Sequence, residues 1–372
     1  LAHALLTRAA PGSVVSFMLP NWHEAATIYL ATQLAGMVAN PILPSLRDRD
    51  LTYLLADTRS RVIFIPEQFR GHDYASMLTR VCTQLREPPN VVVVRGDARE
   101  HTSYNTLFSQ VEPQPLPSVD PDGARLLLYT SGTTGTPKGV LHSQNTIHAL
   151  VKQIGQYWRV APGNKFFVAS PISHIGGSIY TFEAPLLLGS TVVLVDKWDA
   201  SSALEVILRE GCTHMAGATP FLQQLLAAAQ QARTHLPNLK VFICGGASVP
   251  PSLIRNAAAH FHNTIFTRVY GSTEVPVTTV GAPDRATLEH AAETDGRVGI
   301  GEVKLVAADG TAGDTGEIRA RGPQMLIGYL HPEDEASVFD DEGYYRTGDL
   351  GRWVDDSYLV VAGRTKDIII RK

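Results

Sequence analysis

The segment YTSGTTGTPKG, residues 129–139, combines residue types that together bind phosphate. It holds three glycines, five serine or threonine residues and one lysine, directly after the apolar run Leu126–Leu128. Repeated glycines let the backbone approach a ligand closely, exposed N–H groups form an anion-binding array, and Lys138 adds a positive charge. It is not a Walker A loop, because Lys138 lies between Pro137 and Gly139. The pattern therefore predicts a phosphate-binding loop, and the alternative is a polar connector.

Three further segments could complete a nucleotide site. YGSTE, residues 270–274, follows an apolar strand, and its Glu274 could hold magnesium against phosphate oxygens. ICGGASVP, residues 243–250, ends a strand in paired glycines that leave a flat slot for an aromatic base. YYRTGDLG, residues 344–351, places Asp349 where it could accept both hydroxyls of a ribose. Each segment taken alone could equally be a turn or a solvated carboxylate.

These segments and two more occur in an order that resembles one known family. PISHIGG, residues 171–177, and GRTKD, residues 363–367, join YTSGTTGTPKG, the GGA of residues 245–247, YGSTE and YRTGDLG along the chain. The set resembles the adenylate-forming superfamily, which comprises acyl-CoA synthetases, the adenylation domains of peptide synthetases and firefly luciferase. The resemblance covers nearly the whole chain, and several independent matches must coincide to produce it.

The resemblance implies a role for each matching residue. The opening loop would hold the β- and γ-phosphates of ATP, Asp349 the ribose hydroxyls, and Lys366 a hinge about which a C-terminal domain rotates. The implied ATP-binding residues are Thr130, Ser131, Gly132, Thr133, Thr134, Gly135, Thr136, Lys138, Gly245, Gly246, Ala247, Tyr270, Gly271, Ser272, Thr273, Asp349 and Arg364. The implied catalytic residues are Lys138, Thr273, Glu274, Arg364 and Lys366, with Glu274 and Ser131 as magnesium ligands.

The resemblance also implies a pocket for the acyl group. Its candidate residues are small or apolar apart from one imidazole: His174, Ile175, Gly176, Thr219, Gly245, Gly271, Val275 and Pro276. Such a lining favours a fatty, alicyclic or aromatic carboxylate. Peptide-synthetase domains need an acidic partner for the substrate ammonium, and residues 171–181 contain none, so an amino acid is disfavoured. His174 is either the gate of this pocket, as in the family, or a satisfied core histidine.

The implied reaction is ATP-dependent activation of a carboxylic acid. A carboxylate is a poor electrophile, so it attacks the α-phosphorus of ATP, releases pyrophosphate and becomes an acyl-adenylate. Positioning and neutralisation of phosphate charge supply the catalysis, through the loop donors, Lys138 and Mg²⁺ at Glu274. Coenzyme A then attacks the activated carbonyl and AMP leaves. The resemblance thus implies an acid–thiol ligase that uses ATP, Mg²⁺ and coenzyme A.

The ends of the sequence lead us to expect a fragment. The chain starts with LAHALL rather than Met and stops at Lys372, six residues after Lys366, whereas the family continues into a C-terminal domain with a second lysine. We expect such a fragment to bind ATP or acyl-adenylate, to form adenylate slowly and to form thioester hardly at all. The alternatives are a nucleotide-binding protein without turnover, a peptide-synthetase-like adenylation domain, and a luciferase-type oxidation.

Composition narrows the class of protein. The 372 residues are 44% hydrophobic, which suffices for two or more packed subdomains, and the net charge is −4. Because the basic residues form no run, nucleic acid is not an expected partner. Cys82, Cys212 and Cys244 lie too far apart for a metal motif and are odd in number, which favours a cytoplasmic location. We expect no signal peptide and no membrane span, and a homodimer is compatible with these features.

Apolar runs rich in β-branched residues alternate with segments of helical period, which predicts layered α/β subdomains. The expected strands are Ser13–Leu19, Arg61–Ile65, Asn90–Val94, Leu126–Thr130, Phe166–Ala169, Thr191–Val195, Val241–Ile243 and Ile265–Tyr270. The expected helices are Glu24–Val38, Leu204–Arg209, Pro220–Arg233 and Pro251–Phe261. After Arg297, glycine-punctuated strands without helices predict a small antiparallel β-barrel or sheet. We expect α/β subdomains over residues 1–162 and 163–296, a β subdomain over 297–362, and a hinge with the start of a C-terminal domain over 363–372.

Overall fold

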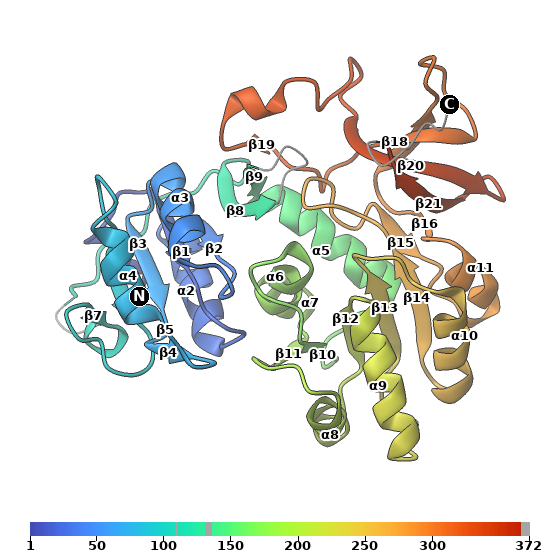
Figure 1. The fold of residues 1–372 in the computed structure, drawn as a ribbon, viewed down its shortest axis with the longest axis horizontal. Helices are drawn as coiled ribbons and strands as arrows, with labels where there is room; N and C mark the ends of the chain where they lie inside the picture. The colour runs from blue at the N-terminus through green and yellow to red at the C-terminus, as the bar shows by residue number, and fades with distance from the viewer. Residues whose placement is uncertain (109–110, 131–135, 366–372) are drawn as a thin grey trace. The chain divides into compact units, whose positions relative to one another are not determined.

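The computed structural model describes residues 1–108, 111–130 and 136–365. The chain forms two compact units. Unit 1 consists of Leu1–Gln144, Pro171–Phe182 and Ile327–His331, and unit 2 consists of Asn145–Ser170, Glu183–Leu326 and Pro332–Lys372. Both units combine helices with sheets, so the predicted α/β class is confirmed (Figure 1). The predicted boundaries after residues 162, 296 and 362 stay a prediction.

Unit 1 is built on a sheet of eight strands in the order β19-β9-β8-β2-β1-β3-β6-β7. The strands are β1 (Val14–Phe17), β2 (Val38–Pro41), β3 (Val62–Ile65), β6 (Asn90–Val93), β7 (Thr102–Ser103), β8 (Ala124–Thr130), β9 (Lys138–Ser143) and β19 (Gly328–Tyr329). Neighbours from β8 to β7 pair in parallel, whereas the pairs β8 with β9 and β9 with β19 are antiparallel. The central parallel strands are short and almost wholly buried, as expected of a parallel sheet covered by helices.

Side-chain alternation distributes the core of unit 1 over both faces of this sheet. In β3, Ile63 and Ile65 join a buried cluster with helices α3 (Asp48–Thr58) and α4 (Tyr74–Cys82). Phe64 lies between them in sequence and therefore points to the opposite face. The sheet is thus packed on two sides.

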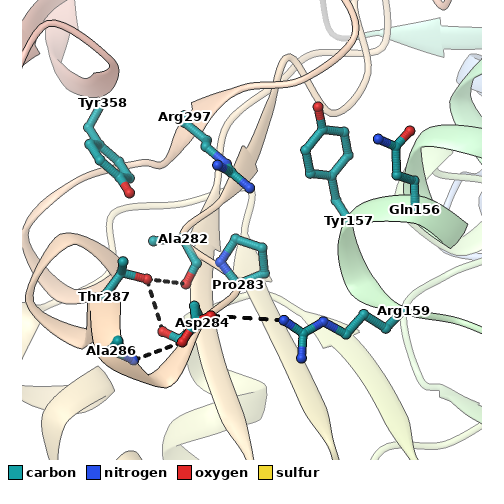
Figure 2. A pocket seen from close by; sticks show the side chains of 10 residues that line it. All are labelled: Gln156, Tyr157, Arg159, Ala282, Pro283, Asp284, Ala286, Thr287, Arg297 and Tyr358. Carbon is teal, nitrogen blue, oxygen red and sulfur yellow. Dashed lines mark hydrogen bonds and ion pairs between the residues drawn. The ribbon is translucent and has the colours of Figure 1, made fainter.

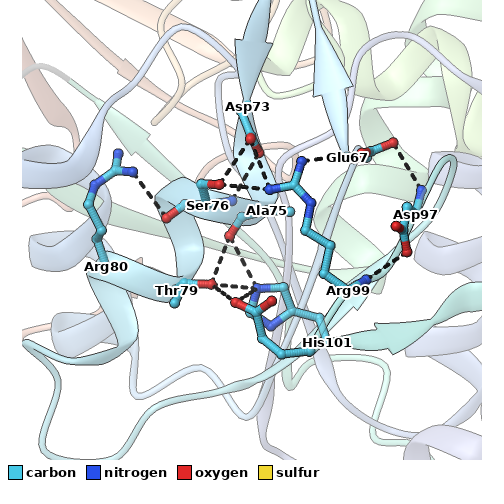
Figure 3. A network of polar contacts seen from close by, with 10 residues as sticks. Glu67, Asp73, Ala75, Ser76, Thr79, Arg80, Asp97, Arg99 and His101 are labelled. Atoms are coloured by element: carbon cyan, nitrogen blue, oxygen red, sulfur yellow. Dashed lines mark hydrogen bonds and ion pairs between the residues drawn. The ribbon is translucent and has the colours of Figure 1, made fainter.

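The N-terminal end of α4 carries a network of polar side chains (Figure 3). Asp73 caps the helix by accepting the Ser76 N–H at 3.0 Å. Arg99 bridges Asp73 and Glu67, at 2.9 and 3.3 Å. Because these side chains are partly exposed, each ion pair contributes at most about 1 kcal/mol. The network fixes where α4 begins.

Unit 2 contains two sheets of different kinds. A parallel sheet has the order β11-β10-β12-β13-β14, and an antiparallel sheet has the order β15-β16-β21-β20-β18-β17. The parallel strands are β10 (Lys165–Val168), β11 (Thr191–Leu194), β12 (His214–Gly217), β13 (Val241–Gly245) and β14 (Ile265–Val269). The antiparallel strands are β15 (Thr279–Gly281), β16 (Arg297–Val298), β17 (Glu302–Val306), β18 (Thr315–Arg321), β20 (Tyr345–Val354) and β21 (Tyr358–Arg364). The antiparallel sheet is curled, which confirms the prediction of a small barrel-like β structure.

Helices pack on the parallel sheet of unit 2. Buried aliphatic side chains of α8 (Ala200–Glu210), α9 (Thr219–Gln231) and α10 (Pro251–His260) contact strand residues that include Phe167 and Phe242. Prolines open α9 and α10, where a missing N–H costs no helical hydrogen bond. The remaining α-helices and strands are α1 (Ala2–Leu6), α2 (His23–Leu34), α5 (Gln144–Trp158), α6 (Ile175–Thr181), α7 (Glu183–Leu188), α11 (Leu288–Glu293), β4 (Gln68–Phe69) and β5 (His72–Asp73), and three short 3₁₀ helices span Tyr104–Thr106, Arg285–Thr287 and Pro332–Glu335. No helix among the described residues is both long and apolar enough to cross a membrane.

The predicted strands all occur, with ends shifted by a few residues. One helix prediction is wrong at its C-terminal end, because the helix expected over Glu24–Val38 is α2 (His23–Leu34). Gly36 takes a left-handed φ of +68°, and Val38 already belongs to β2, where it pairs with Val14. A glycine just past the last turn ends a helix because it adopts this conformation without steric cost. The hydrophobic pattern continues through the boundary and does not reveal it.

Gly296 precedes β16 and lies against Gly281 at the end of β15. Its φ is +97°, and a Cβ added there would lie 2.3 Å from the Gly281 Cα atom. Gly310 has a similar φ of +88°, but a Cβ there would meet nothing within 4 Å. We expect Gly310→Ala to cost about 1 kcal/mol through backbone strain, and Gly296→Ala about 2–3 kcal/mol more through the clash. Urea unfolding measures the difference, and equal losses would contradict the close approach at Gly281.

Candidate active site

The predicted phosphate loop joins two antiparallel strands of unit 1. Strand β8 ends at Thr130 and β9 begins at Lys138, and these two residues are register partners. Lys138 is therefore the first residue of a strand, whereas we expected it within the loop. Thr136 is exposed. Six predicted site residues lie outside the described residues: Ser131, Gly132, Thr133, Thr134, Gly135 and Lys366.

Strand β19, from much later in the chain, pairs with β9 at the lysine end of this hairpin. In the pairing of β19 with β9, Tyr329 lies opposite Val140, and the Leu330 N–H donates to the Gly139 carbonyl at 2.7 Å. The Lys138 ammonium lies over the Tyr329 ring, 5.4 Å from its centre. A cation–π contact of this kind steadies the ammonium group. No local sequence pattern predicts this contact, because Tyr329 lies 191 positions after Lys138.

Three predicted acyl-pocket residues lie at the start of α6 in unit 1. His174 caps the helix, because its Nδ1 accepts the Gly176 N–H at 3.2 Å, and the next residue, Ile175, is buried. The imidazole keeps solvent access, yet the protein around it buries it enough to lower its pKa. Protonation would also replace the accepting lone pair with an N–H and so break the cap. His174 is therefore neutral at pH 7, which suits either the gate or the structural histidine.

Two predicted segments of unit 2 follow neighbouring parallel strands. Gly245 ends β13 and is the register partner of Val269, which ends β14. The segments Gly246–Ala247 and Tyr270–Gly271 thus start from the same edge of the sheet, where ligands of parallel sheets bind. A Cβ at Gly245 would lie 2.8 Å from the Val269 carbonyl oxygen, and Gly246–Ala247 is exposed. The sequence predicts a slot for a planar base at this exposed backbone, and that role stays a prediction.

Three predicted residues from separate segments meet at this edge. The Tyr270 hydroxyl donates to Asp349 Oδ2 at 2.6 Å, and Arg364 Nε lies 3.3 Å from Asp349 Oδ1. Asp349 in β20 and Arg364 in β21 are register partners, so their side chains project from the same face. Burial, followed by the charge of Asp349, raises the pKa of Tyr270 well above its usual range. Its hydroxyl therefore stays a donor, and the cluster presents a carboxylate beside a guanidinium.

A buried ion pair fixes the strands that carry this cluster. Arg268 in β14 donates to Asp295 Oδ1 at 2.5 Å and to the Ala292 carbonyl at 2.8 Å. Asp295 Oδ2 accepts the Val361 N–H of β21 at 2.8 Å. Both side chains of the pair are nearly buried, so removing one partner would cost about 3–5 kcal/mol. Neither residue belongs to a motif, so the sequence alone does not predict this pair.

Two threonine hydroxyls accept hydrogen bonds from the backbone of the cluster residues Tyr270 and Asp349. Neither threonine is among the predicted site residues. The Tyr270 N–H donates to Thr279 Oγ1 at 2.8 Å, and the Asp349 N–H donates to Thr347 Oγ1 at 3.1 Å. Thr347 lies inside the motif YRTGDLG, so its place two residues before the aspartate was a usable signal. Thr279 lies in no motif, and only the fold brings it to Tyr270.

The residues after Tyr270 fold into a tight turn. The Ser272 N–H donates to the Val275 carbonyl at 3.3 Å, and the Val275 N–H donates to the Ser272 hydroxyl at 3.2 Å. A Cβ at Gly271 would lie 2.6 Å from the Val277 nitrogen, so the turn requires glycine there. Five predicted acyl-pocket residues belong to unit 2: Thr219, Gly245, Gly271, Val275 and Pro276. Val275 and Pro276 are buried, and Thr219 donates to the Ser248 carbonyl at 2.8 Å.

Glu274 is the carboxylate predicted to hold magnesium. Its side chain is buried, and its carbonyl accepts the Leu326 N–H at 2.7 Å. In the part of the chain that the structure describes, no group of three His, Cys, Asp or Glu side chains could hold a metal ion by itself. A single carboxylate still fits Mg²⁺, which commonly takes one or two carboxylates together with substrate phosphate oxygens. Glu274 thus suits an ion that arrives with a nucleotide.

A pocket of about 430 Å³ lies elsewhere in unit 2 (Figure 2). Its lining contains none of the predicted site residues and consists of Gln156, Tyr157, Arg159, Ala282, Pro283, Asp284, Ala286, Thr287, Arg297 and Tyr358. The pocket is distant from the cluster of Tyr270, Asp349 and Arg364. The pocket residue Tyr358 and the cluster residue Arg364 are the two ends of β21, which lie about 20 Å apart because a strand rises roughly 3.3 Å per residue. Arg159 and Asp284 pair at 3.9 Å but are 68% and 59% exposed, so water and salt screen their charges. The strand ends near Asp349 are the better candidate for a nucleotide.

Comparison with known proteins shows the family of the chain. A family model described as AMP-binding enzyme matches residues 1–330. Because the match covers most of the 372 residues, the chain belongs to the AMP-binding enzyme family. The resemblance to adenylate-forming enzymes is thereby confirmed.

Named relatives extend the comparison. The medium-chain fatty-acid–CoA ligase of Escherichia coli K12 is 32% identical over 371 residues, covering 97% of this chain and 64% of that protein. The sulfoacetate–CoA ligase of Cupriavidus necator is 29% identical over 368 residues, covering 97% of this chain and 69% of that protein. The chain therefore spans about two thirds of the length of these relatives. A crystal structure described as a long-chain-fatty-acid CoA ligase from Rhodopseudomonas palustris has a TM-score of 0.86 at 23% identity, covering 98% of this chain and 89% of that one, which shows a shared fold.

The environment of His174 predicts its titration. The folded protein lowers its pKa, so we expect an NMR titration midpoint below the value of about 6.5 for a histidine in a peptide. As the pH falls through that peptide value, the unfolded chain binds more protons than the folded chain. The stability that His174 contributes is therefore full above that pH and is lost below it. A midpoint at or above the peptide value would contradict the cap by a neutral imidazole.

Proposed function

We propose that this protein activates a carboxylic acid with ATP, releasing pyrophosphate, and transfers the acyl group of the resulting acyl-adenylate to coenzyme A, giving acyl-CoA and AMP. The observation that carries the proposal is the cluster of Tyr270, Asp349 and Arg364 next to the glycine pair at the strand ends of unit 2. Membership of the AMP-binding enzyme family supports it, as do relatives named as CoA ligases.

The nucleoside of ATP is assigned to unit 2. Asp349 accepts the ribose hydroxyls, since its two carboxylate oxygens offer about four lone-pair sites and its contacts with Tyr270 and Arg364 use only some of them. Adenine lies against the exposed backbone of Gly245–Ala247. Arg364 is 62% exposed in its side chain, so it can turn toward ribose or phosphate at little cost in buried contacts.

The phosphates are assigned to the loop and to Glu274. Lys138 neutralises charge on the β- and γ-phosphates, and Thr273 contacts the α-phosphate. Glu274 would hold Mg²⁺, and the second ligand that the sequence predicts, Ser131, lies outside the described residues. The ion, when bound, neutralises charge on the phosphate oxygens.

The chemistry requires no protein nucleophile. A carboxylate oxygen of the acid forms a bond to the α-phosphorus, and the bond to pyrophosphate breaks. The sulfur of coenzyme A then bonds to the acyl carbon, AMP leaves with the electron pair, and the thiol proton passes to solvent. The protein contributes position and charge, and one such contact is typically worth about 3 kcal/mol, or roughly a hundredfold in rate.

The acid is proposed to be fatty, alicyclic or aromatic. The acyl-pocket candidates are mainly small or apolar, and the segment Pro171–Thr181 contains no carboxylate that could pair with a substrate ammonium. Two relatives are named as CoA ligases of different acids, a medium-chain fatty acid and sulfoacetate, so their names support a CoA ligase without choosing the acid. A cytoplasmic location and a homodimer stay predictions.

We expect Lys138 to contribute to the use of ATP rather than to the stability of the fold. We expect Lys138→Ala to lower the rate of ATP–pyrophosphate exchange about a hundredfold while the melting temperature changes little. The matched control is Lys152→Ala, which removes an exposed lysine of α5 and should leave the exchange unchanged. An unchanged rate in Lys138→Ala would contradict its role.

The same assay, run on the wild-type chain with a panel of acids, tests the reaction. Exchange supported by octanoate, cyclohexanecarboxylate or benzoate agrees with the proposal and names the acid class. Exchange with phenylalanine alone would favour a peptide-synthetase-like adenylation domain. A folded protein that binds ATP but exchanges with none of these acids would favour a nucleotide-binding protein without turnover.

A further inference from the structure

One aspartate of unit 1 joins the segments that flank the phosphate loop. Asp57 in α3 accepts the Tyr129 hydroxyl through Oδ2 and faces His331 Nε2 at 2.7 Å through Oδ1. Tyr129 is 72 positions away along the chain and His331 is 274 positions away. The Asp57 side chain is only 14% exposed, whereas the His331 side chain is 39% exposed, so Asp57 is largely shielded from water and His331 is not. None of the three residues has a role in the reaction proposed above.

Both contacts lie next to the ends of the loop. Tyr129 precedes Thr130, at which β8 ends, and His331 follows two residues after Tyr329, whose ring lies under the Lys138 ammonium. Strands β8, β9 and β19 are joined by ladder hydrogen bonds. Asp57 therefore closes a ring of contacts that runs through Tyr129, the hairpin and β19 back to His331. Such a ring restricts both ends of the loop relative to α3.

Helix α3 touches the lysine end of the loop at a second point. The Tyr53 hydroxyl donates to the Pro137 carbonyl at 3.4 Å. Tyr53 precedes Asp57 by four residues, so the two side chains lie on the same face of the helix. One face of α3 thus contacts the chain on both sides of the loop.

Tyr129 and His331 can both donate a hydrogen bond to the Asp57 carboxylate. Burial, followed by the hydrogen bond to Asp57, raises the pKa of Tyr129 well above its usual range, so the hydroxyl stays a donor. His331 can present an N–H at Nε2 in a neutral tautomer or in the charged form. Hydrogen bonds to an ionised carboxylate are stronger than those between neutral groups, so two of them hold Asp57 firmly.

We propose that Asp57 is a positioning residue for the phosphate loop. Through Tyr129 and His331 it fixes the strand ends at Thr130 and Lys138, which flank residues 131–135. The consequence for ATP rests on the proposed function, whereas the effect on the loop ends does not. A merely structural role would stabilise α3 on the sheet without changing the loop ends.

The test compares four variants of the full 372-residue chain. Tyr129→Phe removes only the hydroxyl, Asp57→Ala removes the shared acceptor, and His331→Gln keeps an N–H donor. Tyr74→Phe is the matched control, because it deletes a tyrosine hydroxyl that donates to the Pro44 carbonyl at 2.7 Å elsewhere in unit 1. Each variant is measured for melting temperature, for amide hydrogen exchange at the loop ends without ligand, and for ATP–pyrophosphate exchange kinetics.

The loop ends are expected to respond selectively. Asp57→Ala and Tyr129→Phe should speed amide exchange in residues 136–141 about tenfold and raise the KM for ATP about tenfold, with little change in the KM for the acid. His331→Gln should retain most of the wild-type behaviour. Tyr74→Phe should lower the melting temperature to a similar extent yet leave amide exchange in this segment and the KM for ATP unchanged.

Two outcomes separate this inference from the proposed function. If Asp57→Ala and Tyr129→Phe alter the loop ends no more than Tyr74→Phe does, Asp57 has no positioning role. If the wild-type chain uses no ATP while Asp57→Ala speeds amide exchange at the loop ends, the proposed function fails and the positioning role stands.

Discussion

The buried ion pair between Arg268 and Asp295 supports the strand ends of unit 2 at which we propose that the nucleotide binds, because it links β14 of the parallel sheet to β21 of the antiparallel sheet. Arg268 lies in β14, two residues before Tyr270, and Asp295 accepts the N–H of Val361 in β21, three residues before Arg364. Taking both charges out of water is costly, and the cost is offset by their contact and by the hydrogen bonds to the Ala292 carbonyl and from the Val361 N–H, while Arg268 Nε has no hydrogen-bond partner among the described residues. The pair therefore restricts movement of β14 relative to β21. This restriction fixes the backbone positions from which the Tyr270 and Arg364 side chains extend.

Three carboxylates of this chain act in the same way. Asp295 contacts the Arg268 guanidinium and a backbone N–H through its two carboxylate oxygens. Asp349 contacts Tyr270 and Arg364 in this way, and Asp57 contacts Tyr129 and His331. An ionised carboxylate has two oxygens and no donor of its own, so it can hold two donors from different segments in a defined arrangement. In unit 1 the contacts join α3 to Tyr129 and His331, and in unit 2 they join the end of β14 to β20 and β21. Each unit thus uses a carboxylate to hold together segments that are far apart in the sequence.

The parts of this arrangement that depend on local chemistry could be predicted from the sequence. Repeated glycines and hydroxyls mark the loop, apolar runs mark the strands, and a glycine before an aspartate marks Asp349, because each signal lies within a few adjacent residues. The strand character of Lys138 was not predictable, since β9 pairs with β8 and with β19, which lies nearly two hundred residues later. Arg268, Asp295, Asp57 and His331 carry no local signal, because their partners are chosen by the tertiary fold. The end of α2 at Leu34 does have a local signal, which is Gly36 just after the helix. The hydrophobic pattern continues past this glycine and therefore predicts a longer helix.

The most direct test of the account is a crystal structure of this chain with a non-hydrolysable acyl-adenylate analogue. The account predicts that both ribose hydroxyls lie within hydrogen-bond distance of Asp349, and that adenine packs on the backbone of Gly245–Ala247. An adenosine bound away from Asp349, for example in the pocket between Tyr157 and Tyr358, would contradict the assignment of the strand ends of unit 2 as the nucleotide site.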